Sequence, residues 1–197
     1  MAAIVDAILL AAGNSSRMGR PKQLLPVEGT PLLVRTVRTL TGSGMLRKIL
    51  VVLGAHAPEL EALVLQEGAE VIVNERWSKG MGASLKMGVA HLMKETVLPS
   101  GVLISVCDQP FLTKEVIRSV AGKTDEHSII ASDYGGSLGP PSCFGSSFYS
   151  ALLTLPDDAG ARMLFNRYPE KLIKVPFPEG ATDLDTPEDY NRYLQRS

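Results

Sequence analysis

The 197-residue sequence lacks the features that mark several common protein classes. Its two cysteines, Cys107 and Cys143, have no C-x-x-C or other metal-binding spacing, so we expect reduced thiols rather than a disulfide framework or a zinc site. No apolar run is as long as a membrane span, and the first residues, MAAIVD, lack the basic flank and cleavage site of a signal peptide. We therefore expect a cytoplasmic protein with no membrane partner.

The sequence also has no excess of charge of either sign. The net charge is -1 and the isoelectric point is near 6.3, which argues against a nucleic-acid partner. Its three histidines, His56, His91 and His127, have no metal-ligand spacing, and no serine lies in a G-x-S-x-G motif. Any site for a charged ligand must then come from a local cluster of side chains.

Apolar runs alternate with amphipathic segments along the whole chain, which predicts an α/β fold with a parallel sheet in a single domain over residues 1–197. Thr30 and Pro31 read as the cap and first residue of a helix, and Pro187 begins the last one. The segment 133–145 consists mostly of Gly, Ser and Pro, which predicts a loop that orders over a ligand. The predicted strands are 4–10, 49–53, 71–73, 101–106, 128–132 and 172–175, and the predicted helices are 31–40, 58–66, 84–95, 113–120, 148–153, 160–168 and one from 187.

The stretch 8–26, ILLAAGNSSRMGRPKQLLP, predicts an anion cradle. Small residues end the first strand, so that a ligand can approach the backbone closely. Arg17, Arg20 and Lys22 then place three cations within six positions, and no carboxylate occurs between residues 7 and 27. The stretch is neither a P-loop, G-x-x-x-x-G-K-[ST], nor a dinucleotide fingerprint, G-x-G-x-x-G.

Three other positions each carry a functional and a structural interpretation. Asp108 follows the most apolar strand, at the sheet edge where a hard cation would bind, but it could also cap the turn before Pro110. Gly82 and Ser84 begin a helix whose free N–H groups could bind an acceptor, or they could form an ordinary helix start. Asp185 could likewise only cap the last helix.

The cradle resembles the signature of MobA-like nucleotidyltransferases, Leu-Ala-Ala-Gly-x-Ser-x-Arg-Met-Gly-x-x-Lys. The residues that match it are Leu10, Ala11, Ala12, Gly13, Ser15, Arg17, Met18, Gly19 and Lys22. The resemblance extends to about Tyr190 and is closest to molybdenum cofactor cytidylyltransferases. It implies a Rossmann-like three-layer α/β/α fold and nucleotide contacts from Leu10 to Ser15, with base and ribose contacts near Gly82 and Ser84.

The resemblance also implies a reaction. CMP would pass from CTP to a phosphorylated pterin, with release of pyrophosphate, while Arg17 and Lys22 neutralise phosphate charge and Asp108 and Asp185 hold Mg²⁺. Within the family, Ala12 is the position that separates cytidylyl from guanylyl transfer. The acceptor phosphate is already ionised near neutral pH, so its attack needs no general base. When no metal is bound, the carboxylates of Asp108 and Asp185 should repel each other.

Two residues depart from the pattern that related cytidylyltransferases often show, and both concern the acceptor. Pro140 stands in place of a histidine, and Ala159 in place of a lysine. Three functions therefore stay open: molybdenum cofactor cytidylyl transfer, guanylyl or sugar-phosphate nucleotidyl transfer on the same fold, and nucleotide-binding regulation without turnover. The pair of acidic residues argues against the last, because binding alone does not require two metal ligands.

Overall fold

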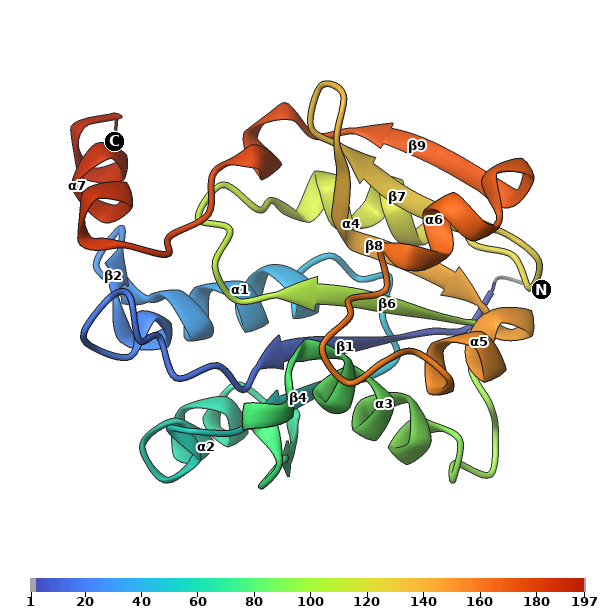
Figure 1. Cartoon of the computed structure of the whole chain (residues 1–197), viewed down its shortest axis with the longest axis horizontal. Helices are drawn as coiled ribbons and strands as arrows, with labels where there is room; N and C mark the ends of the chain where they lie inside the picture. Colours follow the sequence, from blue (N-terminus) through green and yellow to red (C-terminus); the bar gives the residue numbers. More distant parts are fainter. Residues whose placement is uncertain (1–2, 197) are drawn as a thin grey trace.

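The computed structural model describes residues 3–196 and is organised around one seven-stranded sheet (Figure 1). The strand order is β5-β4-β1-β6-β8-β7-β9, and β8 alone runs antiparallel to its two neighbours. The mostly parallel sheet confirms the predicted fold class. The strands are β1 (Val5–Ala11), β4 (Ile49–Leu53), β5 (Glu70–Val73), β6 (Gly101–Val106), β7 (Ile129–Asp133), β8 (Leu138–Gly145) and β9 (Leu172–Pro176), and a separate pair is β2 (Pro26–Val27) with β3 (Thr30–Pro31).

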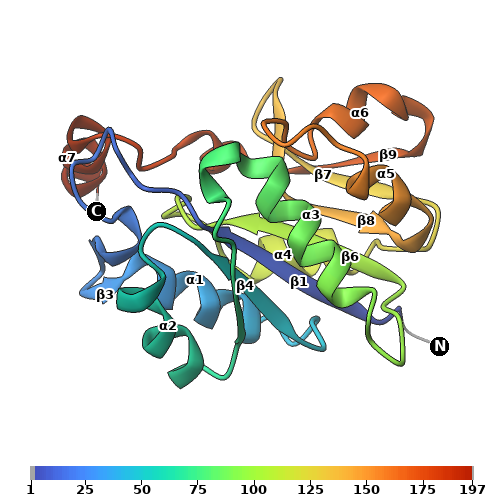
Figure 2. The ribbon, with the colours of Figure 1, turned by 60° about the horizontal axis from the view of Figure 1, so that its bottom comes forward.

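Helices cover both faces of the sheet and make the structure three-layered (Figures 1 and 2). One buried apolar cluster joins the sheet to α1, α2, α4 and α7, and a second joins its other face to α3, α5 and α6. No helix within 3–196 is long and apolar enough to span a membrane. The helices are α1 (Leu32–Thr41), α2 (Ala57–Gln66), α3 (Met81–Leu92), α4 (Lys114–Ala121), α5 (Tyr149–Leu153), α6 (Met163–Arg167) and α7 (Pro187–Arg196).

Strand β1 lies between two parallel neighbours and is buried on both faces, because helices cover both sides of the sheet. Ala7 and Leu9 pack into the first cluster, while Ile8 and Leu10 pack into the second. This alternation explains why the strand reads as a continuous apolar run in the sequence. The carboxyl ends of β1, β4 and β6 lie at the same edge of the sheet, so the segments that follow them meet there.

Gly54, directly after β4, lets that strand end approach the end of β1. A Cβ at Gly54 would lie 2.4 Å from the carbonyl oxygen of Ala12 and 2.7 Å from Cβ of Trp77. Ala55 N–H donates to the same Ala12 carbonyl at 3.1 Å. The absence of a side chain at Gly54 therefore fixes how closely the backbones pack beside the site.

The predicted loop over 133–145 is wrong in its second half, because β8 occupies Leu138–Gly145 between β6 and β7. Pairing with β7 shifts register, since Ala131 pairs with Ser142 whereas Ser132 pairs with Gly139. The two prolines, 140 and 141, are the residues left between these pairs. Proline has no N–H to donate, so a bulge tolerates it inside a sheet, and composition alone hid the strand.

Three predicted helix starts also differ from the structure. Thr30–Pro31 forms β3 instead of a capped helix start, and α1 begins at Leu32 with no side-chain cap. Helix α3 begins at Met81, three residues before the predicted start, and α6 is shorter than predicted. None of these three helices has a side-chain cap in the structure, so the cap signal read from the sequence could not locate their starts. The predicted start of α7 at Pro187 is confirmed.

A buried carboxylate near the start of β1 is neutralised from the next segment of chain. The side chain of Asp6 is fully buried, and Arg47 binds it through two hydrogen bonds of 2.9 and 2.6 Å. Arg47 Nη1 also donates to the carbonyl of Val97 at 3.0 Å. The paired geometry compensates a charge that burial alone would make costly.

Arg47→Met should therefore lower the free energy of unfolding by about 2 kcal/mol, because it leaves the Asp6 charge buried without a partner while Arg47 itself is partly exposed. Arg38→Met is the matched control. Arg38 makes the same two-bond contact with Glu67, but it lies on the surface, so its loss should change stability far less. Urea denaturation of both variants measures the difference, and equal losses would contradict the role of burial.

Candidate functional site

The loop after β1 is fastened by Gln23, a buried side chain that sequence reasoning missed. Its Nε2 donates to the carbonyl oxygens of Ala11 at 3.0 Å and Gly13 at 3.1 Å, and its Oε1 accepts from Ser15 Oγ at 3.2 Å. One amide thus binds both ends of the small-residue segment. The available signal was a lone amide directly before an apolar pair, 24 and 25.

Ser15 gives this loop its tight turn and its connection to Lys22. Its φ of 53° lies in the left-handed region, and its carbonyl accepts from the N–H groups of Met18 and Gly19. Its hydroxyl accepts from Lys22 N–H at 3.0 Å. The turn brings Lys22 back toward the end of β1, so the cation faces the sheet edge.

Lys22 binds the two aspartates that the sequence suggested as metal ligands. Its Nζ lies 2.8 Å from Oδ2 of Asp108 and 2.8 Å from Oδ1 of Asp185. The other oxygen of Asp185 accepts from Arg17 Nη2 at 2.8 Å. Four predicted residues, separated by up to 168 positions, therefore form one charged cluster. The expected repulsion between the carboxylates is offset, because an ammonium lies between them.

Neither aspartate has the capping role that the sequence left open. Leu184 N–H donates to the backbone carbonyl of Asp108 at 2.9 Å, which places the segment before α7 beside the end of β6. The N-terminus of α7 is capped by Thr186 and Asp189, which exchange hydrogen bonds between side chain and backbone. The carboxylate of Asp185 is thus left for the cations, and the capping interpretation is wrong.

The cluster shifts the pKa values of its members. Burial by itself lowers the pKa of Lys22, but Asp108 and Asp185 outweigh it and raise that pKa above its ordinary value. Burial by itself raises the pKa of Asp185, and the hydrogen bonds and charges of Lys22 and Arg17 instead hold it below its ordinary value. Both shifts favour the charged forms of Lys22 and Asp185 near neutral pH.

A third carboxylate, Asp183, was not predicted as a site residue. Burial, together with the charges of Asp108 and Asp185, raises the pKa of Asp183 to about 7. Its position two residues before Asp185 was the available signal, since the chain reads D-x-D there. Near neutral pH this group adds only part of a negative charge to the cluster.

A cavity of about 550 Å³ opens beside the cluster at the carboxyl edge of the sheet. It extends from the ends of β1 and β6 to the start of α3, and its wall carries both apolar side chains and charged groups. The residues that line it are Leu10, Ala11, Ala12, Gly13, Asn14, Lys22, Gln23, Trp77, Ser78, Gly80, Met81, Ser84, Val106, Cys107 and Asp108.

A second cavity of about 310 Å³ adjoins the first, and Asp108 lines both. Leu10, Met81 and Val106 are also shared. The second cavity is bounded on its far side by β8 and α6, and its wall is largely apolar, with Arg162 and Asp183 as charged members. Two cavities of different polarity thus share the carboxylate of Asp108.

Some predicted ligand contacts lie outside the first cavity. Ser15, Arg17 and Gly82 do not line it, although Ser15 supports the loop and Arg17 holds Asp185. Ser84 lines it, but its hydroxyl accepts from Asn74 Nδ2 at 3.0 Å. Trp77 is a cavity residue that sequence reasoning did not select, although it is the only tryptophan in the chain.

The two aspartates suit a hard cation. Oδ1 of Asp108 is buried and has no hydrogen-bond partner. This oxygen can therefore bind a cation or accept a hydrogen bond from a ligand. Mg²⁺ usually takes one or two protein carboxylates and completes its shell with water and phosphate oxygens. Within residues 3–196 no three His, Cys, Asp or Glu side chains form a larger metal cluster. The donor set therefore fits Mg²⁺ with a phosphate ligand better than a structural metal.

Comparison with known proteins agrees with this geometry. The family model described as the MobA-like NTP transferase domain matches residues 7–172. The chain belongs to this family. The match contains β4, β5, β6, β7 and β8 in full and β1 from residue 7 on, and it ends at the first residue of β9. It includes the cradle and Asp108. The segment with Asp185 lies after it.

Relatives with different names match nearly the whole chain. The nicotine blue oxidoreductase of Paenarthrobacter nicotinovorans is 30% identical over 203 residues, or 96% of each chain. The molybdenum cofactor cytidylyltransferase of Escherichia coli K12 is 25% identical over 187 residues, covering 94% of this chain and 93% of the other. A nucleotidyl transferase structure from Methanothermobacter superposes with a TM-score of 0.83 at 23% identity, covering 98% and 99% of the two chains.

Gly82, in the first turn of α3, packs closely against the segment before α6. A Cβ there would lie 2.1 Å from the carbonyl oxygen of Pro156 and 2.6 Å from that of Ala159. Gly82→Ala should force this MobA-like chain to move backbone and lose about 1–3 kcal/mol of stability. Gly160→Ala is the control, since its Cβ would meet only Met81 Sδ at 3.4 Å. Thermal unfolding followed by circular dichroism distinguishes them, and equal melting temperatures would refute the contact.

Proposed function

We propose that this protein transfers CMP from CTP to a phosphorylated small-molecule acceptor of the molybdenum cofactor type and releases pyrophosphate. The observation that supports it most directly is the pair of cavities that meet at Asp108, with the cations Lys22 and Arg17 at the same place. Group transfer needs two ligands side by side and positive charge where they react, and this arrangement supplies both.

The first cavity suits the nucleotide. Small residues at the end of β1 let a base or ribose approach the backbone, and Trp77 offers an aromatic wall. Lys22 lies where the triphosphate would reach the charged cluster. Ala12 is nearly buried in this wall, so its methyl group limits the width available to a base. A narrower pocket favours a pyrimidine, which supports CTP.

The second cavity suits the acceptor. Its apolar wall can hold a flat organic ring, while Arg162 can bind a negatively charged group. Pro140, where related cytidylyltransferases often carry histidine, belongs to this wall. Ala159, where they often carry lysine, lies in the segment that packs on Gly82. Pro140 thus changes the wall of the proposed acceptor cavity, whereas Ala159 lies beside Gly82 and lines neither cavity.

The reaction requires charge neutralisation more than proton transfer. An ionised oxygen of the acceptor phosphate attacks the α-phosphorus of CTP, a new phosphorus–oxygen bond forms, and the bond to the β-phosphate breaks. The electron pair leaves with pyrophosphate, so no protein group has to remove a proton. Lys22 and Arg17 stabilise the negative charge that develops on the departing group.

Asp108 and Asp185 would hold Mg²⁺ in this reaction. When bound, the ion supplies Lewis-acid polarisation of the phosphate oxygens. The protein residues contribute the rest: Asp108 lies between donor and acceptor cavities, and Gln23 keeps the cradle rigid. A rigid loop holds its donors in place before the substrate arrives, so less reorganisation is needed during the reaction.

The direct test is an assay of pyrophosphate release with each of the four NTPs, Mg²⁺, and a set of phosphorylated acceptors. CTP together with a phosphorylated pterin should give turnover, and GTP should give much less. Turnover with a sugar phosphate would assign the second candidate, transfer to another acceptor on the same fold. Tight nucleotide binding without release of pyrophosphate from the NTP, whichever acceptor is present, would instead favour a regulatory protein. Equal turnover with all four NTPs would contradict the cytidylyl assignment.

Ala12→Gly should shift the nucleotide preference from CTP toward GTP by roughly 1–2 kcal/mol, because it removes a methyl group from the pocket wall. Ala11→Gly is the control. Ala11 lines the same cavity, but its side chain packs into the apolar cluster on the opposite face from Leu10, so this change should reduce stability without altering base preference. Calorimetric binding of CTP and GTP to each variant measures the effect. An unchanged ratio in Ala12→Gly would remove this residue from base selection.

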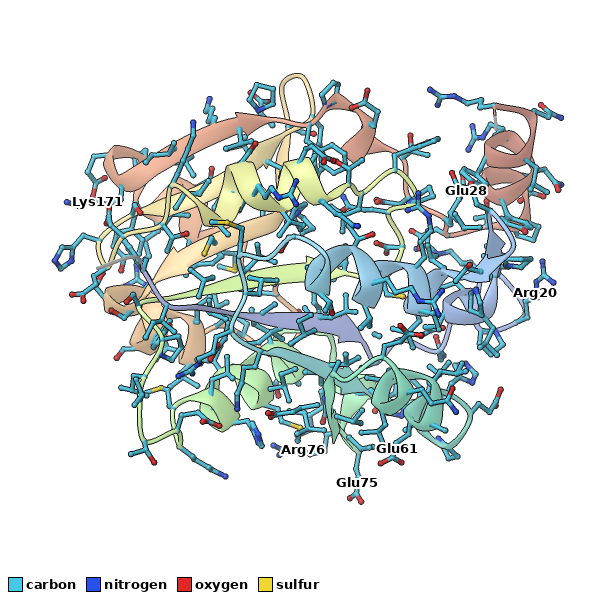
Figure 3. All side chains as sticks on the ribbon, turned by 180° about the vertical axis from the view of Figure 1, so that it is seen from behind. Arg20, Glu28, Glu61, Glu75, Arg76 and Lys171 are labelled. Carbon is cyan, nitrogen blue, oxygen red and sulfur yellow. The ribbon has the colours of Figure 1, made fainter. Side chains whose placement is uncertain are left out.

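Lys22→Ala should lower kcat by about 10² to 10³, because an interaction with the developing pyrophosphate charge is lost. The control is Arg20→Ala in the same loop. Arg20 is exposed and lies at the rim of the molecule (Figure 3). Its guanidinium lies 5.6 Å from the ring centre of Tyr190. Steady-state kinetics should show near-normal turnover for the control. Equal kcat values for the two variants would show that Lys22 has no role in the chemical step.

A further inference from the structure

We propose that Lys22 and a divalent cation compete for the same two carboxylates, so that the free protein keeps its metal site closed with its own ammonium group. This inference deepens the proposed function and rests on it only for the role of the nucleotide. It begins from one observation: Lys22 Nζ contacts Asp108 and Asp185 at the same distance, 2.8 Å. The ammonium occupies the space between the oxygens that would bind the metal.

The two kinds of cation cannot occupy this space together. A divalent ion bound directly to both oxygens would have to lie between them, where the ammonium now is. Two positive charges at such separation repel strongly in a partly buried site. The side chains of Lys22 and Asp108 are only about one-fifth exposed, at 18% and 20%, so water screens this repulsion little. Lys22 must therefore leave before the metal can bind both aspartates.

Charge balance explains what would draw Lys22 away. In the free protein, Lys22 and Arg17 offset the two carboxylates, Asp108 and Asp185, so the cluster is close to neutral. Addition of a divalent cation alone would leave an excess of positive charge. A triphosphate brings negative charge that can accept the hydrogen bonds of Lys22 and Arg17 and free the carboxylates. Metal and nucleotide should consequently increase each other's affinity, as linkage requires.

The structure also shows why the exchange is feasible without unfolding the loop. The backbone of Lys22 is held by Ser15, and Gln23 is held by Ala11 and Gly13. Only the flexible side chain of Lys22 enters the cluster, so it can swing while the loop stays fixed. Oδ1 of Asp108, buried and without a partner, remains ready to bind a metal once the ammonium leaves.

The experiment measures Mn²⁺ binding by electron paramagnetic resonance in nucleotide-free protein. Lys22→Met keeps an unbranched side chain, one atom shorter, and removes its charge. It should tighten Mn²⁺ binding by about tenfold or more, as loss of competing charge-assisted hydrogen bonds implies. Arg20→Met removes the same charge from the same loop without touching the carboxylates. It should change Mn²⁺ affinity by no more than about twofold, the weak effect of a distant screened charge.

Two further variants secure the result. Lys22→Gln repeats the test with a polar side chain, and circular dichroism establishes that each variant is folded. Asp185→Asn added to Lys22→Met should abolish the gain, because it removes one of the two proposed ligands. Mn²⁺ affinity that is unchanged or weaker in both Lys22 variants would overturn the proposal, as would a gain that survives the second substitution. A gain of equal size in Arg20→Met would reduce it to a general charge effect and also overturn it.

A second arm separates this inference from the proposed function. Mn²⁺ is titrated into protein saturated with CTP, after subtraction of the Mn²⁺–CTP complex in solution. CTP should tighten Mn²⁺ binding more in the wild type than in Lys22→Met, because only the wild type has an ammonium to displace. Failure of this arm alone would count against CTP as the nucleotide while the competition stands. Failure of the nucleotide-free arm would refute the competition whatever the pyrophosphate assay shows.

Discussion

A single ammonium group connects the parts of this protein that matter most for its chemistry. Lys22 comes from the loop after β1, Asp108 from the end of β6, and Asp185 from the segment before α7. The hydrogen bond from Leu184 N–H to the Asp108 carbonyl reinforces the same junction through the backbone. Since the ion pairs are partly buried, each partner depends on the others for compensation of its charge. Three segments of the fold thus meet in one cluster in which positive and negative charges compensate each other.

The parallel sheet is what makes this convergence possible. Because β1, β4 and β6 run in the same direction, the polar segments after them share one edge, and Gly54 lets those segments pack closely. The helices on the two faces bury the apolar side chains and leave this edge free. The antiparallel strand β8 forms part of the wall of the second cavity. Two adjacent cavities with one shared carboxylate are the geometric result.

How much of this could be predicted from sequence depended on how local each signal is. The cradle with Lys22 and the strand before Asp108 are contiguous patterns, so their places at the ends of β1 and β6 could be predicted directly from the sequence. The contact of Lys22 with both aspartates depends on tertiary structure, and no local pattern encodes that an ammonium would lie between them. Strand β8 was missed because glycine and proline are typical of loops. In the structure its two prolines lie in a bulge, where the pairing of β8 with β7 shifts register. Gln23 was missed because one amide carries no periodic signal.

The difference between the two cavities suggests why one scaffold can carry several acceptor chemistries. The first cavity is built from the ends of β1 and β6 and contains Lys22, so any change there disturbs the charge cluster. The far wall of the second comes from β8 and α6, whose side chains make none of the cluster's ion pairs. Substitution there alters shape and polarity at little electrostatic cost. Under the proposed assignment of the second cavity to the acceptor, acceptor choice can change while the first cavity keeps its geometry, and Pro140 lies in the wall that is free to change.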